Sequence, residues 1–362
     1  MNGSEDSGVL DQAGHYDPDR HPRAFGGSAG SGLLRCSPAD FFVEETLPFT
    51  PAGEGEHLYL FVEKSGLNTA DVVRLLSKAA SLHPRDIGFA GMKDRHAVTQ
   101  QWFSLYLPGK ADPDLSGLPG SVRLLASIRH NRKLRRGAVK ANHFRLAVRE
   151  LAVDNDLLES NLASIARQGF PNYFGSQRFG RGGGNLERAV AVLARGKTRK
   201  ASEGIYLSAV RSMLFNEVLA ERVRLGNWNR PLPGDVMQIA GSNSLFIADM
   251  EDATLLPRHE AFLVGATGPL CGREARLEPQ EEPRVIEQSV LADYGWWIEG
   301  LARCRLDADR RMLRANASGL DHLVADGRLE LMFSLDSGCY ATSLLRELLD
   351  VTDATRTPQA GS

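Results

Sequence analysis

The carboxylate of Asp94 lies in a run of residues that could support covalent chemistry. Its neighbours are Lys93 and Arg95, small residues precede it, and the apolar run 102–107 follows. Neighbouring cations favour the ionised form of a carboxylate, so we expect Asp94 to be charged at neutral pH. A charged carboxylate in a fixed position can act as a nucleophile, as a base or as a structural anchor. The ordinary alternative is a turn with a solvated salt bridge, since such ion pairs are common and weak.

A basic tract, residues 115–149, contains no Asp or Glu, although the net charge of the whole chain is −2. Such one-sided charge predicts an anionic partner, for example a phosphate backbone, and a solvated basic face is the alternative. The cations of the tract are Arg123, Arg129, Arg132, Lys133, Arg135, Arg136, Lys140, Arg145 and Arg149.

Segment 170–185 mixes aromatic, basic, amide and glycine residues without a helix or strand period. A loop of this kind can offer stacking faces and hydrogen-bond donors to nucleotides. It can equally be a glycine-rich connection whose aromatic rings fill a nearby core. The residues alone do not choose between these two interpretations.

The elements that must position these residues are predicted to be both strands and helices. Strands are expected at 57–62, 102–107, 142–148 and 329–335, from their apolar and β-branched content. One helix should begin at Asn68 or Thr69, and another at Asp154 or Asn155, with Gly169 ending the second. From about residue 198 the sequence pattern changes. It predicts an amphipathic helix over 209–223 and short strands at 236–239 and 245–247. This mixture predicts an α+β fold.

Length and composition limit the class of protein. The chain has 362 residues, enough for two domains, and its 42% hydrophobic and 24% charged content is typical of a soluble globular protein. No apolar run approaches the roughly 20 residues that span a bilayer, and we expect no secretory signal. The 4 cysteines lie far apart, with no histidine at ligand spacing. We therefore expect no metal site, no disulfides and a cytoplasmic location.

Several separate stretches resemble the TruD family of tRNA pseudouridine synthases, and together they cover the chain from about residue 32 to 350. They are segments 38–41, 53–57, 91–99, 129–137, 171–180 and 338–343. The resemblance implies that Asp94 is the catalytic nucleophile. It implies that Phe41 packs at the target uridine and that Asn172 lies at the substrate.

The chain departs from the family pattern at two places. Tyr340 stands where the family has Phe, so an aromatic face is kept but its hydroxyl needs a partner. Arg35 stands where a bacterial relative has Lys, so a cation is kept there. We count Tyr340, Arg35 and Lys93 among the substrate-binding candidates. The basic element would contact tRNA phosphates through Arg129, Arg132, Lys133, Arg135, Arg136 and Lys140.

Taken with the family, the fold would be a catalytic α+β domain built on a mixed, largely antiparallel sheet. The resemblance divides this domain into residues 31–197 and 315–352, with an inserted α/β domain, named TRUD after the family, at 198–314. Residues 1–30 are expected to be a disordered tail, and residues 353–362 a second tail.

The resemblance implies isomerisation of uridine to pseudouridine in tRNA, at uridine 13 of the D-arm, after the uridine has flipped out of its stack. The reaction needs no redox change, metal or cofactor. Arg35 or another nearby cation would keep Asp94 ionised, and attack on the base and attack on the sugar both stay open. tRNA is the expected partner and a monomer the favoured state. The alternatives are another tRNA-modifying enzyme, such as a methyltransferase, and a non-catalytic tRNA-binding or tRNA-folding protein.

Overall fold

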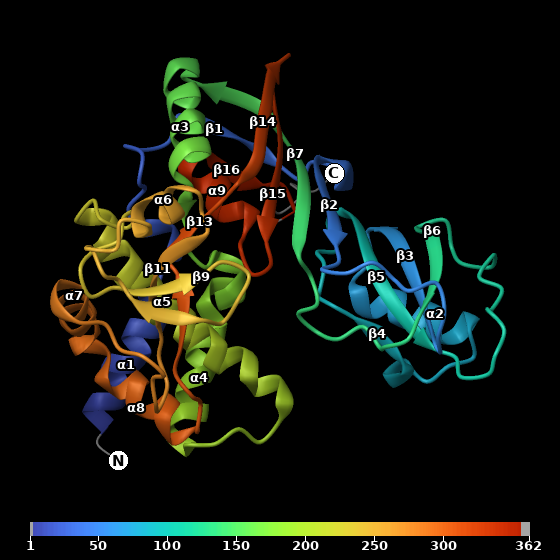
Figure 1. Ribbon diagram of the computed structural model, residues 1–362, viewed down its shortest axis with the longest axis horizontal. Helices are drawn as coiled ribbons and strands as arrows, with labels where there is room; N and C mark the ends of the chain where they lie inside the picture. Colours follow the sequence, from blue (N-terminus) through green and yellow to red (C-terminus); the bar gives the residue numbers. More distant parts are fainter. Residues whose placement is uncertain (1–2, 356–362) are drawn as a thin grey trace. The chain divides into compact units, whose positions relative to one another are not determined.

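The computed structural model describes residues 3–355, which form two compact units (Figure 1). The helical unit contains the chain up to Gly27, then Asn161–Asn316 and Cys339–Glu347. The sheet unit contains Ser28–Ser160, Ala317–Gly338 and the chain from Leu348 onward. The division into a catalytic and an inserted domain, with boundaries at 197 and 315, stays a prediction.

Within the described residues, the sheet unit is built on a 10-stranded sheet in the order β14-β15-β7-β2-β5-β3-β6, with β1, β4 and β16 attached to it. The pairs β2/β5 and β1/β16 are parallel, and the other pairs of this sheet are antiparallel. The predicted α+β class with a mixed, largely antiparallel sheet is therefore confirmed. The strands are β1 (Gly30–Leu34), β2 (Phe41–Thr46), β3 (His57–Ser65), β4 (Ile87–Phe89), β5 (Val98–Tyr106), β6 (Val122–His130), β7 (Ala141–Val153), β14 (Ser318–Ala325), β15 (Arg328–Asp336) and β16 (Asp350–Asp353).

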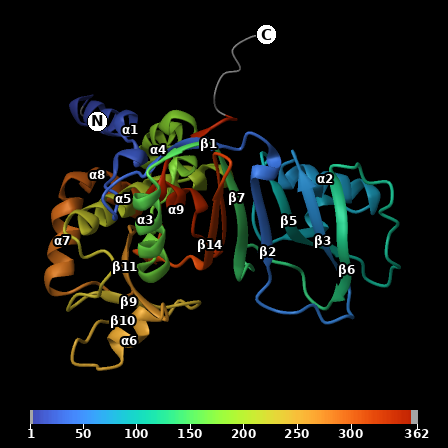
Figure 2. The same ribbon diagram turned by 90° about the horizontal axis from the view of Figure 1, so that it is seen from above.

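Strand β3 shows how the sheet unit obtains its core. Side chains alternate across a strand, and Leu58, Leu60 and Val62 pack with Val72 and Leu76 of helix α2 (Thr69–Ala79). Asn68 precedes this helix as its N-cap, as predicted. His57, Tyr59 and Phe61 alternate with these residues and lie on the opposite face, away from α2. Figure 2 shows α2 beside β3, β5 and β6.

The helical unit combines helices with a four-stranded antiparallel sheet in the order β10-β9-β11-β12 within the part of the chain that the structure describes. Its core is centred on α5 and contains Phe215, Met237 and Trp297. The helix predicted over 209–223 is therefore confirmed, but it is not amphipathic, because buried residues occupy all of its faces. A short pair, β8 (Phe170–Pro171) with β13 (Arg314–Ala315), leads into segment 170–185. The elements are α1 (Gly3–His15), α4 (Gly184–Arg195), α5 (Gly204–Arg224), β9 (Val236–Ile239), β10 (Leu245–Ile247), α6 (Leu255–Glu260), β11 (Val264–Leu270), α7 (Glu281–Leu291), α8 (Gly295–Arg303), β12 (Asp309–Met312) and α9 (Ala341–Leu348).

Helix α3 (Asn155–Gln168) begins and ends as the sequence predicted. The carboxylate of Asp154 accepts a hydrogen bond of 3.1 Å from the N–H of Leu157. Gly169 then adopts a left-handed φ of 73°, which only glycine adopts without strain. Among the helices within residues 3–355, none combines the length and apolar character that crossing a bilayer requires.

The two predicted tails need correction. Helix α1 occupies Gly3–His15, where we predicted disorder, and Val9, Ala13 and Tyr16 join the core of the helical unit. These apolar residues recur at helical spacing, a pattern hidden by the polar average of the segment. At the other end Asp353 belongs to β16, and residues 356–362 of the predicted tail lie outside the described residues.

Candidate active site

Asp94 lies in the loop between β4 and β5 of the sheet unit, and Arg35 holds its carboxylate. Nη2 of Arg35 donates to Oδ2 of Asp94 at 2.8 Å, and the N–H of His96 donates to Oδ1 at 3.0 Å. The Arg35 side chain is 7% exposed and the Asp94 side chain 35% exposed. Charge-assisted hydrogen bonds of this kind fix the orientation of a carboxylate. The loop therefore presents a fixed carboxylate that solvent, and hence a substrate, can reach.

Arg35 is itself fixed by the C-terminal strand. Parallel pairing of β1 with β16 places Asp353 opposite Leu34, and Nη1 of Arg35 donates to Oδ2 of Asp353 at 2.7 Å. Burial opposes ionisation of Asp353, but hydrogen bonds from Thr355 and the charge of Arg35 lower its pKa below the ordinary value. The backbone of Arg35 has a left-handed φ of 59°. Such strain costs about 1 kcal/mol or more in a residue with a Cβ and is found at functional sites.

The two cations beside Asp94 in the sequence do not neutralise it. Nζ of Lys93 lies 3.1 Å from Oε2 of the buried Glu45 and also donates to Asn142. Nε of Arg95 donates to the carbonyl of Gly66 at 3.1 Å. Within residues 3–355 the ion pair of Asp94 is with Arg35, while Lys93 and Arg95 contact other groups. Adjacent residues of an extended loop point in different directions, which is why neighbours in sequence were poor guides.

Lys64 is a fully buried cation that holds the backbone of the Asp94 loop. Its Nζ donates to the carbonyl oxygens of Asp94 and Leu67, each at 2.7 Å. Burial lowers its pKa to about 8, and the charge of Asp94 opposes that change. Lys64 was not among the site residues predicted from the sequence. The available signal was a lysine on the face of β3 that Leu58, Leu60 and Val62 direct into the core.

Phe41 lies beside the same ion pair. The Cζ atom of Arg35 is 4.1 Å from the centroid of the Phe41 ring, and the ring is 5% exposed. Phe144 meets it edge-on with a centroid distance of 6.2 Å. One face of Phe41 therefore supports the guanidinium, and its predicted contact with the uridine stays a prediction.

Asn172 and Tyr340 lie in the helical unit, where Arg311 joins them. The Asn172 side chain donates to the carbonyl of Met312 at 2.9 Å and accepts from Arg311. The Cζ atom of Arg311 is 6.0 Å from the centroid of the Tyr340 ring. Nη2 of Arg178 donates to the Tyr340 hydroxyl at 2.9 Å, which is the partner that this hydroxyl required.

The structure thus groups the predicted site residues in two clusters. Asp94, Arg35, Phe41 and Lys93 lie together in the sheet unit, while Asn172 and Tyr340 lie together in the helical unit. Between residues 3 and 355, no group of His, Cys, Asp or Glu residues is arranged to hold a metal ion.

The basic tract divides into cations that hold the protein together and cations that face solvent. Arg129 belongs to the first kind, since it donates to Asp112 and to the carbonyl of Lys110, each at 2.8 Å. Lys133 donates to the carbonyl of Arg85, and the guanidinium of Arg136 lies 3.6 Å from the ring centroid of Phe89. The exposed cations Arg132 and Arg135 have no ion-pair partner in the part of the chain that the structure describes. Lys140 is also exposed.

Comparison with known proteins covers nearly the whole chain. The family model of tRNA pseudouridine synthase D (TruD) matches residues 26–205 and 183–348. The tRNA pseudouridine synthase D of Methylococcus capsulatus is 45% identical over 336 residues, which are 92% of this chain and 95% of that protein. The tRNA pseudouridine synthase D of Aeromonas salmonicida is 44% identical over 328 residues, 90% of this chain and 93% of that protein.

A solved structure supports the same relationship at the level of the fold. A crystal structure of a Methanosarcina mazei protein described as tRNA pseudouridine synthase D (TruD) superposes with a TM-score of 0.69 at 20% sequence identity. The match covers 94% of this chain and 98% of that chain. The chain therefore belongs to the TruD family of tRNA pseudouridine synthases, which are isomerases.

Proposed function

We propose that this chain isomerises uridine to pseudouridine in tRNA, with uridine 13 of the D-arm as the target and Asp94 as the nucleophile. Membership of the TruD family supports the reaction and the substrate. The resemblance of segment 91–99 supports the choice of Asp94. The observation that carries the proposal is an accessible carboxylate, 35% exposed, held at one oxygen by a buried guanidinium.

The isomerisation breaks the bond between C1′ of the ribose and N1 of uracil and forms a bond between C1′ and C5. The hydrogen at C5 leaves as a proton, and N1 gains a proton, so the reaction needs no outside reactant. Each oxygen of Asp94 keeps a lone pair beyond the hydrogen bond that it accepts. The carboxylate can add to the nucleoside or stabilise an oxocarbenium-like sugar. In either case the hydrogen bond from Arg35 holds the orientation of the carboxylate.

The uridine must leave its stack to reach Asp94, at a cost of a few kcal/mol that contacts in the pocket offset. Phe41 and Tyr340 are our candidates for stacking on the uracil, and Asn172 for reading its amide edge. Lys93 sets the position of the loop through Glu45.

The exposed cations of the basic tract, Arg132, Lys133, Arg135, Arg136 and Lys140, are proposed to contact tRNA phosphates. Each lost phosphate contact lowers the slope of log affinity against log salt concentration by about one. Arg129 would act indirectly, because its donors hold the loop around Asp112.

The proposal is tested with a tRNA transcript that carries uridine 13 and is labelled with tritium at C5 of uridine. Wild-type protein should release tritium, and pseudouridine should map to position 13. Asp94→Asn should bind the transcript with unchanged affinity and release none. Full turnover by Asp94→Asn would refute the assignment of the nucleophile. Tight binding by the wild type without tritium release would identify a tRNA-binding protein that is not an enzyme.

A further inference from the structure

A cavity of about 780 Å³ opens in the sheet unit and is lined by residues of β3, the end of β6, the loop that follows β6, and Phe49. Tyr59 of β3 belongs to its lining and lies on the face of the sheet opposite α2. Lys64, which holds the Asp94 loop, is five positions after Tyr59 along β3, so the backbone of Tyr59 is roughly 16 Å along the strand from that of Lys64. The cavity is therefore separate from the Asp94 cluster.

Three rings of the lining form a shelf. Phe49 stacks on His130 with a centroid distance of 5.0 Å and an interplanar angle of 15°. Tyr59 meets His130 edge-on at 4.9 Å. Phe49 is 38% exposed although it is a large apolar residue. An exposed ring that is already held in a stack can accept a further planar group with little loss of conformational entropy.

Burial and neighbouring cations favour the uncharged form of both imidazoles in the cavity. Nδ1 of His130 accepts a hydrogen bond of 3.1 Å from the N–H of Ala52, which leaves the proton of the neutral ring on Nε2. Burial and the charge of Arg132 lower the pKa of His130, and burial and the charge of Lys133 lower that of His57. Neutral rings can stack on a base, and each can both donate and accept a hydrogen bond.

Two buried polar atoms of the lining have no hydrogen-bond partner among the described residues, namely Oη of Tyr59 and Nδ1 of His57. Tyr59 is 0% exposed and His57 is 8% exposed. Burial raises the pKa of Tyr59 to about 12, so its hydroxyl keeps its proton as a donor. A buried polar group without a partner is costly, and a bound group that supplies the partner removes that cost.

Cations complete the lining. Arg132, Lys133 and Arg135 are exposed and lie on the loop that borders the cavity. A cavity with stacked rings, unpaired donors and acceptors, and three cations is complementary to a base attached to a phosphate.

We propose that this cavity binds one unstacked nucleotide of the tRNA substrate, distinct from the target uridine, with its base on the Phe49 and His130 rings and its phosphate at the cations. The proposal rests on the proposed function for the identity of the RNA. The separation along β3 makes the cavity a second point of attachment, which orients the tRNA while the target uridine reaches Asp94.

Binding of a tRNA transcript with uridine 13 is measured for proteins that also carry Asp94→Asn, so that no turnover occurs. Phe49→Ala should raise Kd about tenfold, as expected for the loss of one stacked ring. Tyr59→Phe should raise Kd severalfold without lowering the thermal stability, because its hydroxyl has no partner to lose. Lys78→Ala, an exposed cation on α2 at the opposite face, is the control and should leave Kd unchanged.

The site of contact is checked by ultraviolet cross-linking of the transcript and mapping of the linked peptide and nucleotide. The proposal expects a link to the segment around Phe49 or Tyr59 from a nucleotide other than uridine 13. Unchanged Kd in both cavity variants would overturn it, as would a link from uridine 13 itself. Binding of AMP in the cavity, with tRNA affinity insensitive to Phe49→Ala, would also overturn it.

The two proposals fail in different measurements. In the wild-type background, the cavity variants should raise KM for tRNA and leave kcat unchanged at saturation. Loss of tritium release in Asp94→Asn tests the nucleophile, whereas the Kd values test the cavity. A wild-type protein that bound RNA at the cavity but released no tritium would refute the enzymatic function and leave the cavity assignment standing.

Discussion

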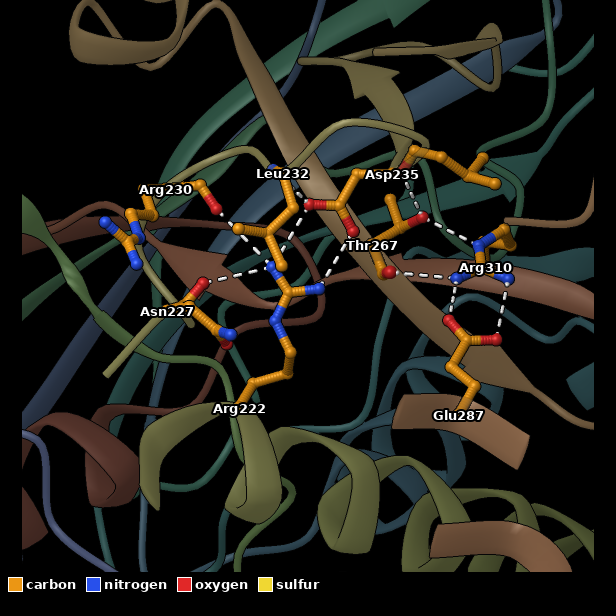
Figure 3. A network of polar contacts seen from close by, with 9 residues as sticks. Arg222, Asn227, Arg230, Leu232, Asp235, Thr267, Glu287 and Arg310 are labelled. Carbon is orange, nitrogen blue, oxygen red and sulfur yellow. Dashed lines mark hydrogen bonds and ion pairs between the residues drawn. The ribbon is translucent and has the colours of Figure 1, made fainter. Parts of the chain in front are cut away.

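Each unit contains an arginine–aspartate ion pair, and the two pairs have different roles. In the helical unit Arg222 binds Asp235, and the two side chains are 3% and 1% exposed (Figure 3). In the sheet unit Arg35 binds Asp94, and the side chains are 7% and 35% exposed. Both arginines are buried, so the pairs differ mainly in how far the carboxylate is exposed to solvent.

The geometry follows the same division. Arg222 takes both oxygens of Asp235, at 2.8 and 3.1 Å, and the N–H of Leu232 donates to Oδ2 at 2.7 Å. The neighbouring Arg310 pairs with Glu287 and donates to the hydroxyl of Thr267 at 2.7 Å (Figure 3). Arg35 donates through Nη2 to one oxygen of Asp94 and through Nη1 to Asp353. A buried carboxylate that binds the guanidinium through both oxygens is scaffold, whereas an exposed one that binds it through a single oxygen is available for chemistry.

The largest expected effect is that of Asp94→Asn on turnover. We expect a loss on the order of a thousandfold or more, because the amide cannot act as an anionic nucleophile. The free energy of unfolding should change by less than about 1 kcal/mol, since the pair is partly exposed. Tritium release and chemical denaturation of the same preparation measure the two quantities. A variant that lost stability instead of turnover would mean that the comparison assigns the wrong pair to catalysis.

Asp235→Asn should give the reverse pattern. Removing one partner leaves the buried guanidinium of Arg222 without its counter-charge, which costs about 3–5 kcal/mol of unfolding free energy. Below the melting temperature of the variant, turnover per folded molecule should remain near that of the wild type. Urea denaturation with activity normalised to the folded fraction checks both statements. Equal stability of the variant and the wild type would contradict the scaffold role.

Local features of the fold were predictable from the sequence, whereas distant pairings were not. The apolar and β-branched content of 57–62 and the cap at Asn68 are local signals, and the strand and the helix that they predict are both confirmed. The parallel pairing of Leu34 with Asp353 joins opposite ends of the chain, and local periodicity carries no information about the partner of a strand. For that reason Asp353 was assigned to a tail.

The candidate site also combines features that local sequence predicts with features that depend on distant contacts. The motif around Asp94 could be recognised, and the cation that holds it was named as Arg35 or a neighbour. Lys64 and Asp353 were missed, because their importance depends on burial and on pairing that only the folded chain shows. Arg95 contacts the carbonyl of Gly66, because adjacency in sequence does not decide which groups lie in contact.

Lys64→Met should change the pH dependence of stability. The folded pKa of Lys64 is about 8 and its ordinary value is 10.5, so the unfolded chain binds more protons between these values. The free energy of unfolding of the wild type should therefore rise with pH across that window, by at most about 3 kcal/mol, and the variant should lack this rise. Urea denaturation of both proteins from pH 7 to 10.5 measures the difference. Parallel curves would show that Lys64 is not perturbed by burial.

The smallest effect is expected for Asp353→Asn, which acts on Asp94 only through Arg35. The amide keeps the volume but removes one of the two negative charges that hold the guanidinium, so Arg35 can turn away from Asp94. We expect kcat to fall about threefold to tenfold, the size of one charge-assisted hydrogen bond, with KM for tRNA unchanged. Asp326→Asn, in the exposed turn between β14 and β15, is the control and should alter neither constant. A raised KM with normal kcat would make Asp353 a tRNA-binding residue instead, and the exposed carboxylate of Asp94 would then owe its orientation to Arg35 and the loop backbone alone.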